Sequence, residues 1–454
     1  MTPIRRAAPA TRLRRRARRR LDTVRAAADA RWGRPRQGHG PVYLVAPAGN
    51  PNHGDEQLLA GWLRFLRHRL PGTPVVVDCH TPGQAAVLHH SEHPDVLFTD
   101  TLWRLAGQRA EAGAAAAVEF ARRAVAELGT DPAVASGIDL ARSASVVHLI
   151  GGGYVNDQWP HHLGVAAAAG ELGRLSGARV VATGQGFLPC GDPALLADAL
   201  RGYELVTVRD AGSLELLADS GAPVRHAGDD GWLALSAPGD LDAVAGGRHL
   251  IDHPVYSADP DTCRDVMLCA QSDLTDPAAV ADTVARVLAD WAVAGERLSV
   301  IEAIPGGDRV VWDLVCARAR AAVGGGAGSD GDDDDEVGRA LADLQLHRAR
   351  FVSFREVWAE GLPARPGQVW LTTRFHPHLF AGARGASGVA VRTGSAYYDV
   401  KHGSLADAGS PWATVGVGEE RVPAFPTAGG FHPEAVAGHV RAAEALAEEL
   451  YPLG

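Results

Sequence analysis

The stretch VVHLIGGGYVNDQW (residues 146–159) places three consecutive glycines directly after a mostly apolar run. Such a run is typical of a strand buried on both faces of a parallel sheet. Three glycines cost chain entropy, and at the carboxyl end of a parallel strand they would let a ligand contact bare backbone. Their spacing matches neither GxGxxG nor the P-loop. The stretch therefore predicts a ligand-facing loop on a doubly wound sheet, formed by Gly151, Gly152 and Gly153, with Asn156 and Asp157 as polar candidates beside it.

Short apolar runs alternate with longer helical patterns on both sides of this stretch, and the pattern restarts after about residue 240. This alternation predicts two doubly wound, Rossmann-like α/β domains of residues 41–240 and 241–432 that face one another across a cleft. An amphipathic helix is expected over residues 433–454. The expected strands lie at residues 42–46, 74–78, 95–98, 145–150, 178–183, 204–208, 265–270, 297–303, 349–354, 368–373 and 387–392.

The composition is that of a globular protein, with 46% hydrophobic and 22% charged residues in a chain of 454 residues. The net charge of −10 argues against general binding of nucleic acid by the folded body. Five cysteines are widely spaced without a CxxC pair, which favours reduced thiols in the cytoplasm over disulfides or a zinc site. No apolar run of about 18 residues is present to span a membrane.

Two segments carry concentrated charge. Residues 1–40 begin with nine arginines among the first twenty residues and lack the apolar run of a signal peptide, so we expect a disordered basic arm. Attraction to an anionic membrane surface is an alternative role for this arm, and nucleic-acid binding is a weaker one. Residues 324–338 combine glycines and aspartates and predict an exposed acidic loop, because the spacing of an EF-hand is missing.

The loop in VAPAGNPNHGDEQLLAGWLRFL (residues 45–66) connects an apolar run to a helix that we expect to begin at Asp55. Small residues and a helix N-terminus favour a bound anion near Asn50 and Gly54. A carboxylate at the helix start would already satisfy its free N–H groups, so a capped turn is the alternative. Asp55 would otherwise act as a base or accept a hydrogen bond from a sugar hydroxyl.

Arg209 follows the apolar run of ELVTVRDAGSLELL (residues 204–217), while Asp210 and Ser213 are typical of a helix start. A guanidinium at the carboxyl end of a strand is placed to bind a carboxylate or a phosphate. The alternative is a buried ion pair with Asp210 or another acid.

Basic and imidazole side chains gather in TTRFHPHLF (residues 372–380). In extended backbone, Arg374 and His376 would project to the same side, which suggests an anion-binding catalytic site. His378 would join them unless a helix starting near Pro377 turned it away, and histidines with a purely structural role are the alternative. A metal site is disfavoured because Arg374 would repel a cation. Lys401 is a further cation for the same site.

Taken in order, six segments resemble the polysaccharide pyruvyl transferase family, whose two-domain fold is similar to that of GT-B glycosyltransferases. The resemblance spans residues 42–405, although the first loop departs from the family pattern and leaves the acceptor open. The segments are GNPNHGDEQLL (49–59), LIGGGYVND (149–157), VTVRDAGS (206–213), GDDGWL (228–233), TTRFHPHLFAGARGASGVAV (372–391) and YYDVKHGSL (397–405).

The resemblance implies transfer of the enolpyruvyl unit of phosphoenolpyruvate to a saccharide, with no cofactor and no metal, in polysaccharide biosynthesis for the cell envelope. It implies that Arg209 and Arg374 clamp the donor and that His376 donates a proton or stabilises the departing phosphate. Asp55 would take a hydroxyl proton. The expected location is the cytoplasm, at the inner face of the membrane if the basic arm binds lipid. Two alternatives are a GT-B glycosyltransferase that uses a nucleotide sugar and a non-catalytic sugar- or anion-binding protein.

Overall fold

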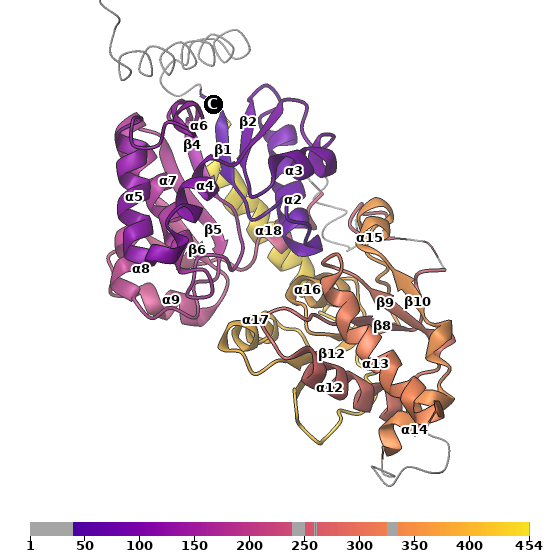
Figure 1. Cartoon of the computed structure of the whole chain (residues 1–454). Helices are drawn as coiled ribbons and strands as arrows, with labels where there is room; N and C mark the ends of the chain where they lie inside the picture. Colours follow the sequence, from indigo (N-terminus) through magenta and orange to yellow (C-terminus); the bar gives the residue numbers. More distant parts are fainter. Residues whose placement is uncertain (1–39, 238–249, 258, 260, 325–334, 454) are drawn as a thin grey trace, which may run out of the picture.

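A computed structural model describes residues 40–237, 250–257, 259, 261–324 and 335–453, which form two α/β domains (Figure 1). The N-terminal domain holds a seven-stranded parallel sheet in the order β3-β2-β1-β4-β5-β6-β7. Its central strands are buried on both faces, as their unbroken apolar sequences require. The strands are β1 (Val42–Val45), β2 (Val75–Asp78), β3 (Val96–Thr99), β4 (Val146–Leu149), β5 (Arg179–Gln185), β6 (Leu205–Val208) and β7 (Val224–His226).

The C-terminal domain repeats this plan with a six-stranded parallel sheet in the order β10-β9-β8-β11-β12-β13. Both orders reverse direction at the first strand of the domain, which is the feature that places ligands at the carboxyl ends of doubly wound sheets. The strands are β8 (Val266–Cys269), β9 (Leu298–Ile301), β10 (Arg350–Val352), β11 (Val369–Thr372), β12 (Ser387–Arg392) and β13 (Ala413–Gly416).

Helices cover both sheets. The N-terminal domain contains α2 (His53–Arg69), α3 (Pro82–His89), α4 (Thr101–Gly107), α5 (Ala114–Ala126), α6 (Ala135–Ala141), α7 (Leu163–Ser176), α8 (Pro193–Ala199), α9 (Ala211–Leu217) and α10 (Gly231–Ala234). The second half contains α12 (Pro277–Asp290), α13 (Gly307–Gly324), α14 (Glu336–Asp343), α15 (Phe354–Glu360), α16 (Phe375–Ala383), α17 (Ala396–Asp407) and α18 (Pro433–Leu450). The expectation of two doubly wound domains is therefore confirmed, and each expected strand is found within a few residues of its predicted bounds. Strands β7 and β13 were not expected.

The last helix, α18, crosses back to the N-terminal domain and lies beside its sheet (Figure 1). Leu446, Ala447, Leu450 and Tyr451 join the apolar cluster formed by β1 and α2. The carbonyl of Tyr451 accepts a hydrogen bond from Arg69 Nε at 3.0 Å. The chain therefore passes between the two domains twice.

Three sequence expectations fall wholly or mainly outside the described residues. They are the basic arm, the domain boundary near residue 240 and most of the acidic loop of residues 324–338. Among the residues that are described, no helix is both long and apolar enough to cross a membrane.

Candidate functional site at the domain interface

The loops that follow the carboxyl ends of the two sheets meet at the domain interface. Tyr397 Oη, at the start of α17, donates a hydrogen bond of 2.8 Å to the carbonyl of Gly153, which follows β4. The N–H of His53, at the start of α2, donates to the carbonyl of Ala303, which follows β9, at 2.9 Å. Side chains from several strand ends of both domains are thereby brought to one place.

Asp229, between β7 and α10, connects two cationic groups in this interface. Its Oδ2 accepts a hydrogen bond of 3.0 Å from Arg209 Nη1, and its Oδ1 lies 3.3 Å from His376 Nε2. The contact with His376 is an ion-pair contact without hydrogen-bond geometry. Burial opposes ionisation, but the charges of His376 and Arg209 hold the pKa of Asp229 well below its ordinary value. Asp229 is therefore a buried anion that contacts one basic side chain from each domain.

Lys401 and Asp55 supply a second pair of opposite charges. The Nζ of Lys401 lies 3.5 Å from the ring centroid of Tyr397, and Lys401 forms no ion pair among the described residues. Burial and the charge of Arg209 lower the pKa of Lys401 far below its ordinary value. Burial raises the pKa of Asp55 against the opposing charges of His376 and Lys401. Burial thus favours the neutral form of each of these two groups.

Two predicted glycines make room for these side chains. A Cβ added at Gly54, in the first turn of α2, would overlap the imidazole of His376. A Cβ at Gly153 would lie 2.7 Å from Arg209 Nη2 and 3.3 Å from Lys401 Cε. Gly54 and Gly153 therefore allow the cationic side chains to approach the backbone.

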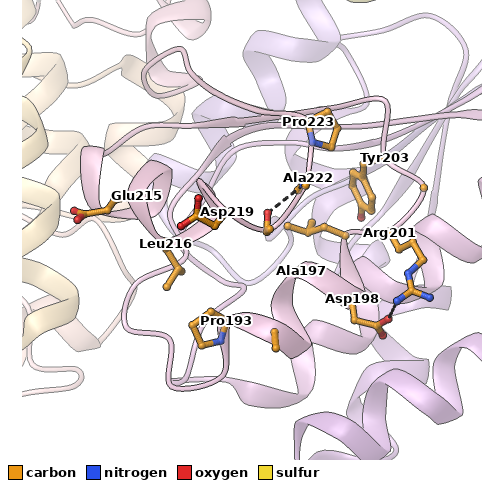
Figure 2. A pocket seen from close by; sticks show the side chains of 15 residues that line it. Pro193, Ala197, Asp198, Arg201, Tyr203, Glu215, Leu216, Asp219, Ala222 and Pro223 are labelled. Carbon is orange, nitrogen blue, oxygen red and sulfur yellow. Dashed lines mark hydrogen bonds and ion pairs between the residues drawn. The ribbon is translucent and has the colours of Figure 1, made fainter.

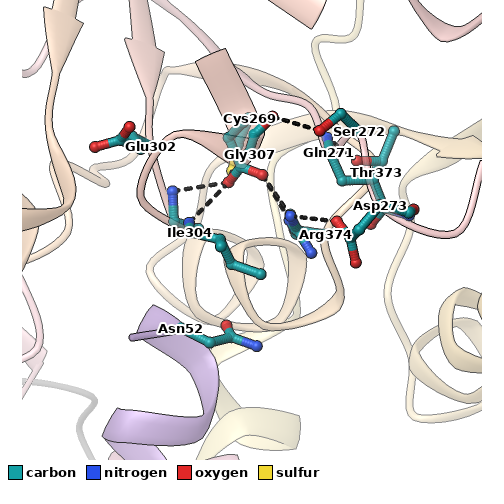
Figure 3. Close-up of polar contacts among 12 residues, drawn as sticks. Asn52, Cys269, Gln271, Ser272, Asp273, Glu302, Ile304, Gly307, Thr373 and Arg374 are labelled. Carbon is teal, nitrogen blue, oxygen red and sulfur yellow. Dashed lines mark hydrogen bonds and ion pairs between the residues drawn. The ribbon is translucent and has the colours of Figure 1, made fainter. Parts of the chain in front are cut away.

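Arg374 is bound by two carboxylates of its own domain, as Figure 3 shows. Its Nε lies 3.1 Å from Asp308 Oδ1, and its Nη2 contacts the same oxygen and lies 2.7 Å from Asp273 Oδ1. Asp273 in turn accepts a hydrogen bond of 2.9 Å from Tyr398 Oη. The guanidinium of Arg374 therefore binds side chains of the protein itself. The charges of both acids raise the pKa of Arg374 in spite of its burial.

The expected strand geometry of Arg374 and His376 is wrong. Strand β11 ends at Thr372 and α16 begins at Phe375, so Arg374 is the N-cap residue and His376 lies in the first helical turn. Pro377 also lies in this first turn, where its missing N–H leaves no helical hydrogen bond unmade. The two side chains diverge as a result, with Arg374 facing Asp308 and His376 facing Asp229.

His378 has a purely structural role, which was one of the two alternatives predicted for it from the sequence. It is buried, and its Nε2 lies 2.7 Å from Ser410 Oγ while its Nδ1 lies 3.1 Å from His402 Nδ1. Its ring stacks on Trp412 with centroids 4.2 Å apart. Within the described part of the chain, no group of three or more His, Cys, Asp or Glu side chains is placed to hold a metal ion.

The expectation that the glycine loop exposes bare backbone to a ligand is wrong for two of its residues. The N–H of Gly151 donates to Asp230 Oδ2 at 2.7 Å, and the N–H of Gly152 donates to the carbonyl of Gly184 at 3.3 Å. Buried carboxylates and neighbouring strands therefore take up donors that the sequence suggested were free.

The polar candidates beside the glycine loop also make internal contacts. The Nδ2 of Asn156 donates to the carbonyl of Gly153 at 2.9 Å, and Asp157 Oδ2 accepts from the N–H of Gly191 at 2.6 Å. Asn50 is exposed in the loop before α2. The structure thus brings together Gly54, Asp55, Gly153, Arg209, His376 and Lys401.

Sequence reasoning missed Asp229, Asp273 and Asp308 as members of the site. The segment GDDGWL contained the first of these and was noted only as part of the family pattern. Two adjacent acids in a glycine-flanked loop after a strand were the available signal. Tyr397 lies in the same segment as Lys401 but was not predicted as a site residue. Its hydroxyl group donates the hydrogen bond to Gly153 that connects the two domains.

A separate hollow of about 650 Å³ lies elsewhere on the N-terminal domain, between α8 and α9 (Figure 2). Tyr203 and Pro223 line it and precede β6 and β7, so it opens at the amino ends of these strands. Asp198 in its wall is paired with Arg122 and Arg201. None of the predicted site residues lines this hollow.

Comparison with known families and structures gives one family match. Residues 52–267 match the family described as polysaccharide pyruvyl transferase, which confirms the resemblance over this part of the chain. The match contains Asp55, Gly153, Arg209 and Asp229 and ends before α16. A search of curated proteins finds no match.

Three of the similar solved structures align with most of the chain at low sequence identity. One is a UDP-N-acetylglucosamine 2-epimerase at 12% identity and a TM-score of 0.47, covering 90% of this chain and 95% of its own. A putative epimerase of the same name from Listeria monocytogenes has 11% identity and a TM-score of 0.43, with 91% and 98% covered. A spinosyn rhamnosyltransferase has 16% identity and a TM-score of 0.38, with 90% and 91% covered.

Proposed function

We propose that this chain, whose residues 52–267 match the polysaccharide pyruvyl transferase family, transfers the enolpyruvyl unit of phosphoenolpyruvate to two hydroxyls of a saccharide. The products are a pyruvate ketal and inorganic phosphate. The observation that carries the proposal is the interdomain cluster in which Arg209 and Lys401 lie beside Asp55 and His376. A doubly anionic donor and an acid–base reaction both require such a cluster.

Arg209 and Lys401 are the proposed donor clamp. The Nη1 of Arg209 donates a hydrogen bond to Asp229, while its Nη2 makes no ion pair among the described residues. Lys401 lies close enough for the charge of Arg209 to lower the pKa of Lys401, and the charge of a bound anion would oppose this effect. Arg374, the second arginine expected in the clamp, instead supports the site through Asp273 and Tyr398.

Ketal formation needs one proton on the methylene carbon of the donor and the loss of two hydroxyl protons from the acceptor. In the proposed sequence, His376 protonates the methylene carbon, and the first hydroxyl attacks the oxocarbenium-like carbon as Asp55 accepts its proton. The carbon–oxygen bond to phosphate then breaks as Asp55 gives its proton to the departing phosphate, and the second hydroxyl closes the ketal as its proton passes to His376. Two hydroxyl protons are thus balanced by one on the new methyl group and one on the phosphate. General acid–base help of this kind is worth roughly 10²–10⁴-fold in rate.

Substrate entry in this proposal requires the domains to part at their contact. The imidazole of His376 is held between Asp229 and the backbone of Gly54, and Tyr397 Oη is bonded to Gly153. Such contacts across a two-domain interface are of the kind that hinge motion breaks and remakes.

The glycosyltransferase alternative is disfavoured by the loop between β9 and α13. In many nucleotide-binding folds the backbone N–H groups of such a loop hold a diphosphate. Here the N–H groups of Ala303 and Ile304 donate to Asp308 Oδ2 at 2.8 and 3.0 Å, and that of Gly306 donates to Glu302 Oε1 at 2.8 Å. Two carboxylates of the chain thus fill the loop and would repel a diphosphate.

The deciding experiment measures phosphate release from phosphoenolpyruvate by the full chain with a panel of glycans and lipid-linked sugars. The proposal expects acceptor-dependent release of phosphate and a ketal detectable by mass spectrometry. A parallel assay with nucleotide sugars measures nucleotide release. Nucleotide release without phosphate release would replace the proposal by the glycosyltransferase alternative, and binding of phosphoenolpyruvate without turnover would favour the non-catalytic one.

A further inference from the structure

An aromatic cluster lies at the carboxyl ends of β2 and β4, beside the candidate site. Its members contact one another in a chain of rings. His80 and Trp103 have centroids 3.9 Å apart, Trp103 and His162 5.0 Å, and Trp159 and His162 6.0 Å with the planes 17° apart. His161 lies 4.4 Å from His162. The function proposed above assigns no role to this cluster.

The cluster has a fixed base and an accessible edge. Trp103, Tyr154 and His162 are buried, and each bonds the backbone: Trp103 Nε1 to Asp78 at 3.1 Å, Tyr154 Oη to Ile150 at 3.0 Å, and His162 Nδ1 to Tyr154 at 2.8 Å. Trp159 and His161 are half-buried, and His80 is exposed. Within the described residues, the indole N–H of Trp159 makes no hydrogen bond to the protein.

Trp159 joins this cluster to the proposed reaction site. Its ring meets that of Tyr397 edge to face, with centroids 5.8 Å apart and the planes 82° apart. Tyr397 is the residue that binds Gly153 and lies under Lys401. A molecule held on Trp159 would therefore lie beside Tyr397, the residue whose ring contacts Lys401.

The chemistry of the cluster suits an uncharged ligand with an apolar face and a polar rim. Tryptophan combines a wide apolar surface with one N–H donor, and such side chains serve as rigid anchors in binding sites. Loss of water where the His80 ring packs on Trp103 lowers the pKa of His80 to about 4, and partial burial lowers that of His161, so both rings are neutral at pH 7. Neutral imidazoles offer one donor and one acceptor each without attracting an anion. A pyranose ring has this combination of a C–H face and hydroxyl rim.

We infer that Trp159, together with His80 and His161, whose rings both contact His162, is the platform on which a neutral sugar ring of the acceptor stacks. The inference rests on the proposed function, because it assigns the second substrate of the same site. The proposed site then has two parts. Arg209, which follows β6, and Lys401 of α17 form the cationic part, and the loops after β2 and β4 form the aromatic part.

The test is saturation-transfer NMR on the full chain with the methyl glycosides of glucose, galactose, mannose and N-acetylglucosamine. The wild-type chain is expected to transfer saturation to at least one glycoside. Trp159→Ala is expected to lower that transfer at least about fivefold, whereas Trp159→Tyr retains a planar ring and most of the signal. The matched control is Trp358→Ala, because Trp358 is also half-buried and also meets the other domain, at His89 with centroids 5.1 Å apart.

Two outcomes overturn the inference: no saturation transfer to any of the four glycosides in the wild-type chain, or equal transfer in wild type and Trp159→Ala. If Trp159→Ala fails to fold, His161→Ala replaces it, with an expected loss of about threefold or more. Phosphate release from phosphoenolpyruvate is measured separately. Trp159-dependent glycoside binding without phosphate release would contradict the proposed reaction and leave the sugar platform standing. With an active enzyme, Trp159→Ala is expected to raise the acceptor KM about tenfold and to leave the donor KM unchanged.

Discussion

His376 Nε2 lies 3.3 Å from Asp229 Oδ1, so an imidazole of the C-terminal domain faces a carboxylate of the N-terminal domain. The other oxygen of Asp229 binds Arg209. One buried carboxylate therefore sets the positions of two cationic groups that approach from different domains. The relative position of the domains and the arrangement of the site are thus linked through a single side chain.

Replacing Asp229 by Asn is expected to destabilise the chain and to lower activity together. Removal of one member of a buried ion pair typically costs about 3–5 kcal/mol, because the remaining charge is left without compensation. We expect a loss of that order in the free energy of unfolding in urea, and a fall in kcat/KM for phosphoenolpyruvate of roughly 10²-fold. Asp219→Asn is the control, since Asp219 is exposed on the same domain. Equal stability of the two variants would contradict the role given to Asp229.

Gly54→Ala is expected to abolish most activity while the chain stays folded. The added methyl group would overlap the ring of His376, which must then leave Asp229. Gly83, near the start of α3, has open space around its Cα, so Gly83→Ala is a matched substitution of a helical glycine. That control is expected to gain up to about 1 kcal/mol from lower chain entropy and to keep full phosphate release. Wild-type activity in Gly54→Ala would show that the position of His376 is unimportant.

Arg374→Gln is expected to act mainly through stability. It removes the positive charge beside Asp308, whose carboxylate is fully buried and whose pKa burial already raises against the charge of Arg374. We expect about 3–5 kcal/mol lower unfolding free energy at pH 7. For comparison, Arg297→Gln removes an exposed pair with Asp265 and should cost at most about 1 kcal/mol. A variant that unfolds like wild type but loses donor affinity would instead restore Arg374 to the donor clamp.

His53 makes the folded chain sensitive to acid. Both ring nitrogens are buried without a hydrogen-bond partner among the described residues, and burial lowers the pKa of His53 to about 3 from an ordinary value of 6.5. The unfolded chain therefore takes up this proton first, so the stability contributed by the neutral ring is complete above pH 6.5 and is lost as the pH falls toward 3.

His53→Leu is expected to remove this part of the acid sensitivity. Each pH unit below 6.5 costs about 1.4 kcal/mol for such a group, so the variant should gain about 2 kcal/mol over wild type between pH 7 and pH 5. Urea unfolding at both pH values measures this difference. The exposed His90 provides the comparison, and His90→Leu is expected to leave the pH dependence unchanged.

The central parallel strands were predictable because each is a largely apolar run that its sheet buries on both faces. Strand β7 was missed because its three residues, Val224 to His226, are largely exposed and carry no apolar pattern. The sequence predicted Arg209 at the carboxyl end of a strand and Lys401 as a further cation of the site, and in the structure Arg209 directly follows β6 while Lys401 lies within α17. Their partners come from segments far along the chain, and a single sequence holds no information on those pairings.

The start of α16 is a second feature that the sequence alone could not predict. The sequence after Thr372 fits both a continuing strand and the first turn of a helix, because Pro377 is compatible with either. The choice depends on the carboxylate of Asp308, which lies 66 residues away and holds Arg374 at the N-cap position. Tertiary contacts therefore decided where the strand ended and which way His376 pointed.

The return of α18 to the first domain has a consequence for biosynthesis. The apolar cluster that supports β1 and α2 is completed by Leu446, Leu450 and Tyr451, which are translated after the C-terminal domain. The first domain to be translated thus holds an open apolar face until the second has been made. Folding during translation cannot proceed by finishing one domain before the other, and a nascent chain halted near residue 430 would expose a surface for chaperones to bind.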